Sequence, residues 1–222
     1  MKHLTATIII VLFLSSIGFA QSNKQLSKFK TFSKDSTNLK EYYRTSLSKF
    51  DLKKGEKNAS IGAGYGNQEV AMSVFNDDID WTLQDIDSTS LNPQLFNDVL
   101  HYFENIIKKP IKAKFSFVLG NEKKTNLPED TFDKILIINT YHEITERASI
   151  LADVRRALKK DGKVIILESM AKKKGQIHQG CRDLKLWEPD FLQEMEGFNF
   201  KLLDKVIPKK GITWSYYTFE GI

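Results

Sequence analysis

The sequence contains only one cysteine, Cys181, among 222 residues. A single thiol excludes an intramolecular disulfide, so a hydrophobic core has to supply the stability of the folded chain. Prolines and glycines are few as well, at 5 and 12, and there is no low-complexity tract or internal repeat. With 41% apolar and 27% charged residues, the composition excludes a fibrous, disordered or repeat protein and indicates one globular domain.

Long apolar runs are missing except at the beginning of the chain. A basic start at Lys2 precedes a mostly apolar stretch over 4–19, and the small residues Gly18 and Ala20 stand before Gln21. This pattern is typical of a signal peptide. We therefore expect residues 1–20 to be removed and the protein to be exported, either to a periplasm or out of the cell. The run is shorter than the roughly 20 residues of a membrane-spanning helix, and an uncleaved signal anchor is the alternative.

Positive charge is in slight excess but is not concentrated. The 33 Lys and Arg residues against 28 Asp and Glu give a net charge of +5, spread over short clusters such as 172–174 and 209–210. No basic helix or interleaved aromatic stripe of the kind that follows phosphates is present. We expect solvated lysines and no nucleic-acid partner, and the sequence does not indicate an oligomeric state.

Apolar spacing predicts a polar lead-in over 21–40 and an α/β domain over 41–222. A helical pattern over 38–50 is expected to lie across the mouth of the domain, and strand and helix patterns then alternate. The expected strands are 59–61, 81–84, 115–119, 132–138, 164–167, 198–206 and 212–219, and the expected helices are 67–77, 91–108, 145–159 and 188–196. Such alternation predicts a mostly parallel sheet with helices on both faces, and the closing hairpin adds an antiparallel strand.

A glycine-rich turn follows the first predicted strand. Residues 61–66 read Ile-Gly-Ala-Gly-Tyr-Gly and open the next helix. Glycines let the backbone turn tightly and approach a ligand, and free N–H groups there favour a carboxylate or a phosphate. A nicotinamide-binding fingerprint requires a glycine three positions after the second one, where this chain has Asn67. That oxidoreductase function is therefore disfavoured.

Asp85 ends the second predicted strand, 23 residues beyond Gly62. A carboxylate at this place can accept hydrogen bonds from both hydroxyl groups of a ribose. The alternative is a capping or turn role, which we assign instead to Asp87 or Ser88.

Six segments in order resemble the class I S-adenosylmethionine-dependent methyltransferases. They are 61–66, 85–87, 119–121, 127–133, 139–143 and 158–163, and together the likeness extends over residues 50 to about 205. The closest resemblance is to methyltransferase-domain proteins that share a Tyr-His-Glu segment after the fourth strand. The resemblance implies a Rossmann-like sheet of seven strands with the last strand antiparallel, and S-adenosyl-L-methionine as the cofactor.

The resemblance also implies roles for individual residues. Gly62, Gly64 and Gly66 would hold the methionine part of the cofactor, and Asp85 would bind the ribose. Ile86 would lie against the adenine, Asn121 and Glu122 would sit at its edge, and Asn139 with Tyr141 would line the floor beneath the sulfonium. The set of implied cofactor residues is Gly62, Gly64, Gly66, Asp85, Ile86, Asn121, Glu122 and Asn139.

Two positions depart from the family pattern. Ser60 stands where many members have an acid that helps to hold the amino-acid end of the cofactor, and Asn121 stands where many have an aspartate. The carbonyl oxygen of Asn121 can still accept a hydrogen bond from an adenine amino group. The substitution at Ser60 is the one that bears on cofactor affinity.

His142 and Tyr141 are the candidate catalytic residues. His142 follows the fourth predicted strand, where it can accept a proton from a substrate O–H or N–H group, and the alternative is that it only shapes the pocket. Glu143 is expected to serve the start of the following helix. The pair His178 and Cys181 has a spacing that a metal could use, but with no second pair nearby we expect no metal site.

The segment 172–187, with Arg182 and Trp187, is either a substrate-facing cover or a solvated connecting loop. The function that the sequence predicts is transfer of a methyl group from S-adenosylmethionine to a small acceptor, whose nucleophile the sequence does not name. The alternative is an exported, non-catalytic relative that binds a nucleoside-like ligand or a protein partner. That alternative is motivated by the export signal and by Ser60.

Overall fold

A computed structural model describes residues 35–76, 78–178, 181–208 and 213–222 of the chain. The predicted signal peptide and most of the predicted lead-in lie outside the described residues. Within the described ranges, no helix is both long enough and apolar enough to cross a membrane.

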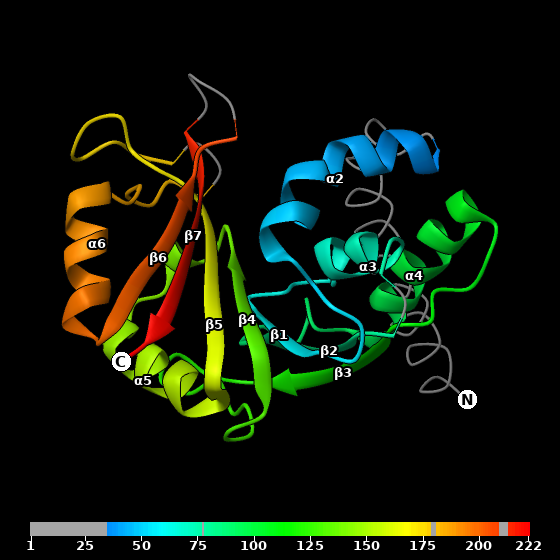
Figure 1. Ribbon diagram of the computed structural model, residues 1–222, viewed down its shortest axis with the longest axis horizontal. Helices are drawn as coiled ribbons and strands as arrows, with labels where there is room; N and C mark the ends of the chain where they lie inside the picture. Colours follow the sequence, from blue (N-terminus) through cyan, green and yellow to red (C-terminus); the bar gives the residue numbers. More distant parts are fainter. Residues whose placement is uncertain (1–34, 77, 179–180, 209–212) are drawn as a thin grey trace, which may run out of the picture.

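A single seven-stranded sheet forms the centre of the domain, with the strand order β3-β2-β1-β4-β5-β7-β6 (Figure 1). The strands are β1 (Lys57–Ile61), β2 (Asp80–Asp85), β3 (Lys114–Leu119), β4 (Phe132–Ile138), β5 (Leu158–Ser169), β6 (Phe200–Val206) and β7 (Trp214–Gly221). β7 pairs antiparallel with both β5 and β6, and the pairs from β3 to β5 are parallel. The predicted Rossmann-like sheet with an antiparallel last strand is therefore confirmed.

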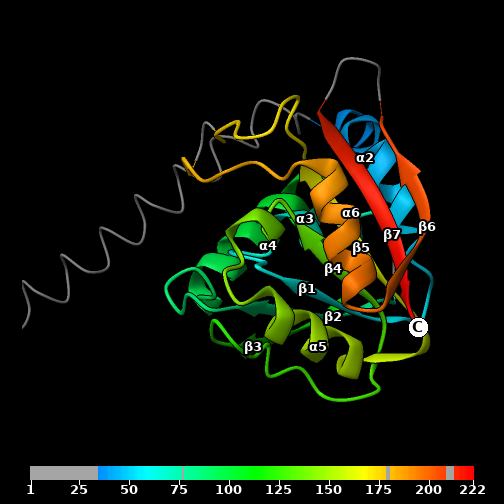
Figure 2. The ribbon, with the colours of Figure 1, turned by 90° about the vertical axis from the view of Figure 1, so that its left-hand side faces the viewer.

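Helices cover both faces of this sheet (Figures 1 and 2). They are α2 (Ser36–Phe50), α3 (Asn67–Ser73), α4 (Pro93–Ile107), the 3-10 turn η1 (Tyr141–Glu143), α5 (Arg147–Ala157) and α6 (Glu188–Gly197). α2, α3 and α4 lie on one face and α5 and α6 on the other, each over its own apolar core.

Successive side chains of the central strands point alternately into the two cores. In β4, Ile135 and Ile137 point into the core under α5, while Leu136 between them points into the core under α3. All three side chains are fully buried. This is the pattern of a parallel strand covered on both faces, as the apolar run predicted.

Two elements differ from the sequence-based expectation. The predicted helix over 145–159 is shorter, because α5 ends at Ala157 and β5 begins at Leu158. The carbonyl groups of Arg156 and Ala157 accept hydrogen bonds from the N–H groups of Asp130 and Thr131, which replaces a further helical turn. The helix predicted over 38–50 is α2, which begins two residues earlier, at Ser36, and packs beside α3 and through Phe50 against Tyr216.

The strand order reverses direction between β1 and β4, because the chain proceeds outward from β1 to β3 and then returns to β4 on the other side. Ligands of open parallel sheets bind at the carboxyl ends of the strands at such a reversal point. The glycine-rich turn after β1 and the segment after β4 meet there.

Candidate cofactor site

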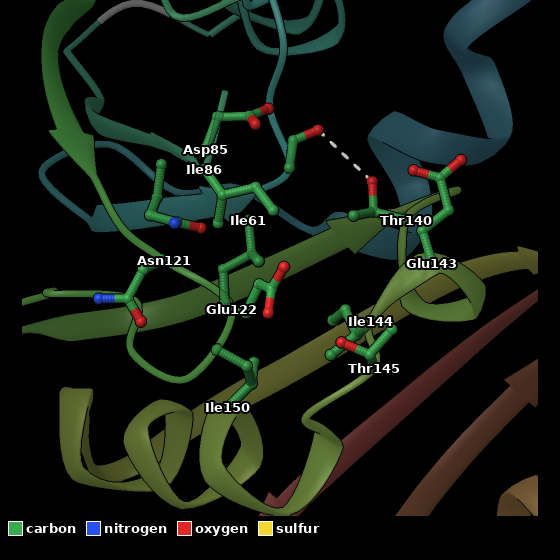
Figure 3. Close-up of a pocket in the computed structure, with 12 residues that line it drawn as sticks. Ile61, Asp85, Ile86, Asn121, Glu122, Thr140, Glu143, Ile144, Thr145 and Ile150 are labelled. Carbon is green, nitrogen blue, oxygen red and sulfur yellow. Dashed lines mark hydrogen bonds between the residues drawn. The ribbon is translucent and has the colours of Figure 1, made fainter. Parts of the chain in front are cut away.

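A hollow of about 160 Å³ opens at the carboxyl ends of the central strands (Figure 3). It is smaller than the roughly 300–1,000 Å³ of pockets that enclose a whole small ligand, so part of a cofactor of this size would lie in the open. The residues that line it are Ile61, Gly62, Gln84, Asp85, Ile86, Asn121, Glu122, Thr140, Glu143, Ile144, Thr145 and Ile150. They come from the ends of β1, β2, β3 and β4 and from the start of α5.

The turn after β1 has a left-handed backbone at each of its glycines. The φ angles of Gly62, Gly64 and Gly66 are +67°, +55° and +72°. A side chain at Gly62 would collide with Thr140, whose Cγ2 atom lies 2.2 Å from the place of a Cβ. A Cβ atom at Gly64 would have no other atom of the described residues within 4 Å. The chain therefore needs glycine at 62 for packing, whereas at 64 the backbone itself stays open to a ligand.

Asp85 points toward this turn, as the ribose-binding hypothesis requires. Its Oδ2 atom accepts a hydrogen bond from the N–H of Gly64 at 2.9 Å, and its Oδ1 atom accepts one from the N–H of Asp87 at 2.9 Å. A carboxylate has about four acceptor positions, so two remain for hydroxyl groups. Asp87 instead holds a turn by accepting from Thr89 and Ser90, which lowers the pKa of Asp87 and confirms its predicted turn role.

Two residues that follow the carboxyl ends of β2 and β3, Ile86 and Asn121, border the hollow. Ile86 is 56% exposed, which leaves an apolar surface free for a flat ring. Asn121 also lines the hollow, but its Oδ1 atom accepts from the N–H groups of Lys123 and Lys124 at 2.9 and 3.0 Å. The carbonyl that we expected to meet an adenine amino group is thus engaged in a turn. The Nδ2 group remains as a donor for a ring nitrogen.

Gln84 is a site residue that sequence reasoning missed. It lines the hollow, and its Oε1 atom is buried without a hydrogen-bond partner among the described residues. An orphaned buried acceptor costs about 1–3 kcal/mol unless a ligand or a water donates to it. The residue precedes Asp85 in β2, so the only sequence signal was a polar residue inside a buried strand.

The helix after the glycine turn places a buried acid beside Ser60. Glu69 of α3 is fully buried, and its Oε1 atom accepts a hydrogen bond from the Ser60 hydroxyl at 2.5 Å. Its Oε2 atom has no partner among the described residues. Burial raises the pKa of Glu69 to about 7. A carboxyl group therefore does lie behind the glycine turn, although it comes from nine residues further along the chain.

The segment after β4 differs from the expectation at its first three positions. Asn139 and Tyr141 are absent from the lining of the hollow, and Thr140 between them is present. The Tyr141 side chain is fully buried on the other side, where its hydroxyl donates to Glu194 at 3.0 Å and its ring packs on Phe191. Tyr141 is thus a core residue, and the structure does not bring it to the site.

His142 is also directed away from the hollow. Its Nδ1 atom lies 2.9 Å from the Glu168 carboxylate, and both side chains are buried. This hydrogen bond raises the pKa of His142 above its usual range. Glu143 lines the hollow, in contrast to the helix-start role that we expected. The described residues of 172–187 do not line the hollow.

The charged side chains that line the hollow are all acidic. They are Asp85, Glu122 and Glu143, and no Lys or Arg joins them although the chain as a whole carries +5. Figure 3 shows these carboxylates distributed around the rim rather than paired with each other. Such a surface attracts a cationic ligand and repels phosphate groups.

The fold and the glycine turn define a class I S-adenosylmethionine-dependent methyltransferase domain. Residues 61–166 match the family described as "Methyltransferase domain", which identifies this part of the chain as a member of that family. The cofactor of this class is S-adenosylmethionine. A search of curated proteins found no match.

Solved structures support the same fold. A methyltransferase from Aquifex aeolicus has a TM-score of 0.61 at 16% identity, and the alignment covers 83% of this chain and 98% of that one. A TehB-like methyltransferase from Corynebacterium glutamicum has a TM-score of 0.56 at 18% identity, and the alignment covers 91% of this chain and 99% of that one. A glycopeptide N-methyltransferase in complex with sinefungin has a TM-score of 0.60 at 11% identity, and the alignment covers 82% of this chain and 85% of that one. At these identities the likeness shows the fold alone.

We predict that Gly62→Ala disrupts the site through Thr140. The added Cβ would overlap the Thr140 side chain at a φ of +67°, so overpacking and a left-handed alanine should lower the free energy of unfolding by about 2–4 kcal/mol. Chemical denaturation measures this. Gly55→Ala is the control, because Gly55 has a similar φ of +81° with nothing within 4 Å, and equal losses in the two variants would contradict the packing role.

We predict that Glu69→Gln stabilises the protein at neutral and higher pH. With a folded pKa of about 7 against the ordinary 4.5, the Glu69 carboxyl costs nothing below about pH 4.5. Its cost grows between pH 4.5 and 7, where only the unfolded chain is deprotonated, and reaches about 3 kcal/mol above that window. Denaturation of both proteins from pH 5 to 9 should show the gain of the variant appear with rising pH. The exposed Glu41→Gln should show no such trend.

Proposed function

We propose that the protein is a methyltransferase that binds S-adenosylmethionine in the hollow and transfers its methyl group to a small acceptor. The observation that carries the proposal is the acidic lining at the end of a glycine-rich turn. Nucleotide cofactors with phosphates would meet three carboxylates and no basic side chain there. A sulfonium cofactor has positive charge and no phosphate, so it suits this surface.

The residues present fit the cofactor at its ribose and ring positions. Asp85 has two free acceptor positions beside the open backbone of Gly64, which suits a pair of hydroxyl groups. Gln84 offers a buried acceptor that the described residues leave unsatisfied. Ile86 provides the exposed apolar surface for the adenine ring.

The bound cofactor supplies a methyl group on a positively charged sulfur, ready for in-line attack by a nucleophile. The chain's contribution is to position the two reacting groups. Their alignment alone can lower the activation free energy by about 7–11 kcal/mol. Thr140 and Glu143 occupy the β4 side of the hollow. We assign them the place that the resemblance implied for Asn139 and Tyr141. Glu143, with a half-exposed side chain, is the charged group on that side of the hollow.

We predict that Asp85→Asn weakens binding of S-adenosylmethionine and of its demethylated product by about 10- to 100-fold. The variant keeps one oxygen for the turn but loses a charge-assisted acceptor for the ribose, which is worth about 1.5–3 kcal/mol. Isothermal titration calorimetry on the purified protein measures both affinities. Asp78→Asn is the control, since that exposed carboxylate pairs with Lys54 at 3.5 Å and is not among the residues that line the hollow.

Two results would decide against the proposal. If the parent protein binds neither ligand, the cofactor assignment fails. If it binds both but transfers no radiolabelled methyl group to a panel of small oxygen, nitrogen and sulfur nucleophiles, the non-catalytic alternative takes its place.

We also propose that residues 1–20 direct export and are removed before Gln21. The proposal is supported by the basic start, the apolar run and the small residues before the cleavage point. Fractionation of producing cells followed by N-terminal sequencing should find Gln21 as the first residue outside the cytoplasm. Replacing Ala20 with a bulky residue should leave the precursor unprocessed. A cytoplasmic protein that retains Met1 would refute the export signal.

A further inference from the structure

Beside the hollow, three side chains with metal-binding atoms converge from distant parts of the sequence. The Cys181 sulfur lies 3.4 Å from Nε2 of His142 and 3.3 Å from Nδ1 of His178. All three ligand atoms lie within 4.8 Å of one another. The spacing of His178 and Cys181 alone led us to expect no metal site, because no second pair stands nearby in the sequence. The fold supplies the missing ligand from the segment after β4.

These separations match the edges of a zinc tetrahedron. With bonds of about 2.3 Å to sulfur and 2.0–2.1 Å to nitrogen, two ligands at a tetrahedral angle are about 3.5 Å apart. The two observed sulfur–nitrogen distances are 3.4 and 3.3 Å. Two edges of such a tetrahedron are therefore already present, and the two histidine nitrogens that form the third lie within 4.8 Å of each other.

A buried carboxylate fixes the orientation of His142. Oε1 of Glu168 is 2.9 Å from Nδ1 of His142, and the two side chains are only 1% and 2% exposed. Glu168 is itself held by the N–H groups of His142 and Ser169 at 3.3 and 3.1 Å. With Nδ1 bound to a carboxylate, Nε2 presents its lone pair toward Cys181. This is the supporting arrangement that metal-binding histidines commonly have.

The other two ligands are held by a narrow antiparallel ribbon. Its backbone hydrogen bonds join His178 to Asp183 at 2.7 Å and Lys185 to Gln176 at 2.8 Å, beside the bridge between Ile177 and Leu184. The ribbon brings His178 over the ring of His142, with ring centroids 4.8 Å apart. The site thus joins the segment after β5 to the segment after β4.

Glu143 is placed to complete the coordination. Its Oε1 atom is 3.6 Å from Nε2 of His142, and its carboxylate lies within 4.8 Å of the Cys181 sulfur together with Asp183. Two nitrogens, one sulfur and one carboxylate oxygen are a donor set that suits zinc and is poor for calcium or magnesium. Because Glu143 also lines the hollow, an ion here would sit at the acceptor side of the proposed cofactor site.

The geometry points to a zinc site formed by His142, His178 and Cys181, with Glu143 as the fourth ligand. It joins the ribbon to the rim of the hollow. The site rests on the positions of these four side chains and holds whether or not the protein transfers methyl groups.

The test is metal binding by the purified protein after removal of metal with a chelator, in a buffer with a reductant that does not bind metal. The parent should take up one Zn²⁺ per chain, measured by elemental analysis and by competition with a chromogenic chelator. With Co²⁺ it should show the near-ultraviolet charge-transfer band of a cobalt–thiolate bond. Unfolding followed by circular dichroism should show that Zn²⁺ raises the melting temperature.

Variants of two ligands and of the supporting carboxylate separate the site from surface binding. Cys181→Ser should remove the charge-transfer band, and Cys181→Ser and His178→Ala should each weaken Zn²⁺ binding by more than about 100-fold. Glu168→Gln should weaken it by about 10- to 100-fold, the effect of losing a supporting carboxylate. His101→Ala, at an exposed histidine of α4, is the control and should bind like the parent.

If the parent binds Zn²⁺ no better than Cys181→Ser, or if its Co²⁺ spectrum lacks the thiolate band while circular dichroism shows a folded protein, the three side chains form a hydrogen-bonded cluster and no metal site.

Discussion

The close packing of Thr140 on Gly62 is the contact on which the arrangement of the site depends. It holds the chain leaving β1 against the chain leaving β4, at the point where the strand order reverses. The hydroxyl of Thr140 also lies 3.4 Å from the carbonyl oxygen of Gly62, and Figure 3 marks this interaction with a dashed line. Because a glycine is the only residue that fits here, the turn can bend back toward Asp85 and leave the Gly64 backbone open. The ribose position and the acceptor position are then defined by the same turn.

Charge separates this hollow from the rest of the molecule. The surface is basic on average, yet Asp85, Glu122 and Glu143 border the hollow without a basic neighbour in its lining. Behind the turn, Glu69 adds a buried carboxyl whose pKa is raised to about 7 by burial. This buried carboxyl lowers the free energy of unfolding at neutral and higher pH. Proteins concentrate such locally unfavourable groups at functional sites.

The segment after β4 contributes to three environments within four residues. Thr140 and Glu143 face the hollow, Tyr141 is a core side chain against α6, and His142 turns toward Glu168 and Cys181. The short 3-10 turn makes this possible, since successive residues there point in different directions. The identity of the residues in this segment indicated that it was functional. Their directions could not be deduced from the identities.

The sequence by itself determined the sheet, the two helical layers and the antiparallel closing strand, because apolar periodicity and glycine positions are local signals that the fold obeys. It also placed the glycine turn, Asp85, Ile86 and Glu122 correctly at one end of the sheet, since strand ends converge whenever parallel strands alternate with helices. Only the tertiary structure decided that Gln84 and Thr140 line the hollow, that the Glu69 carboxyl lies beside Ser60, and that His142 meets His178 and Cys181. Those outcomes depend on which way a side chain points and on contacts between residues far apart in the chain, and neither is encoded in spacing along the sequence.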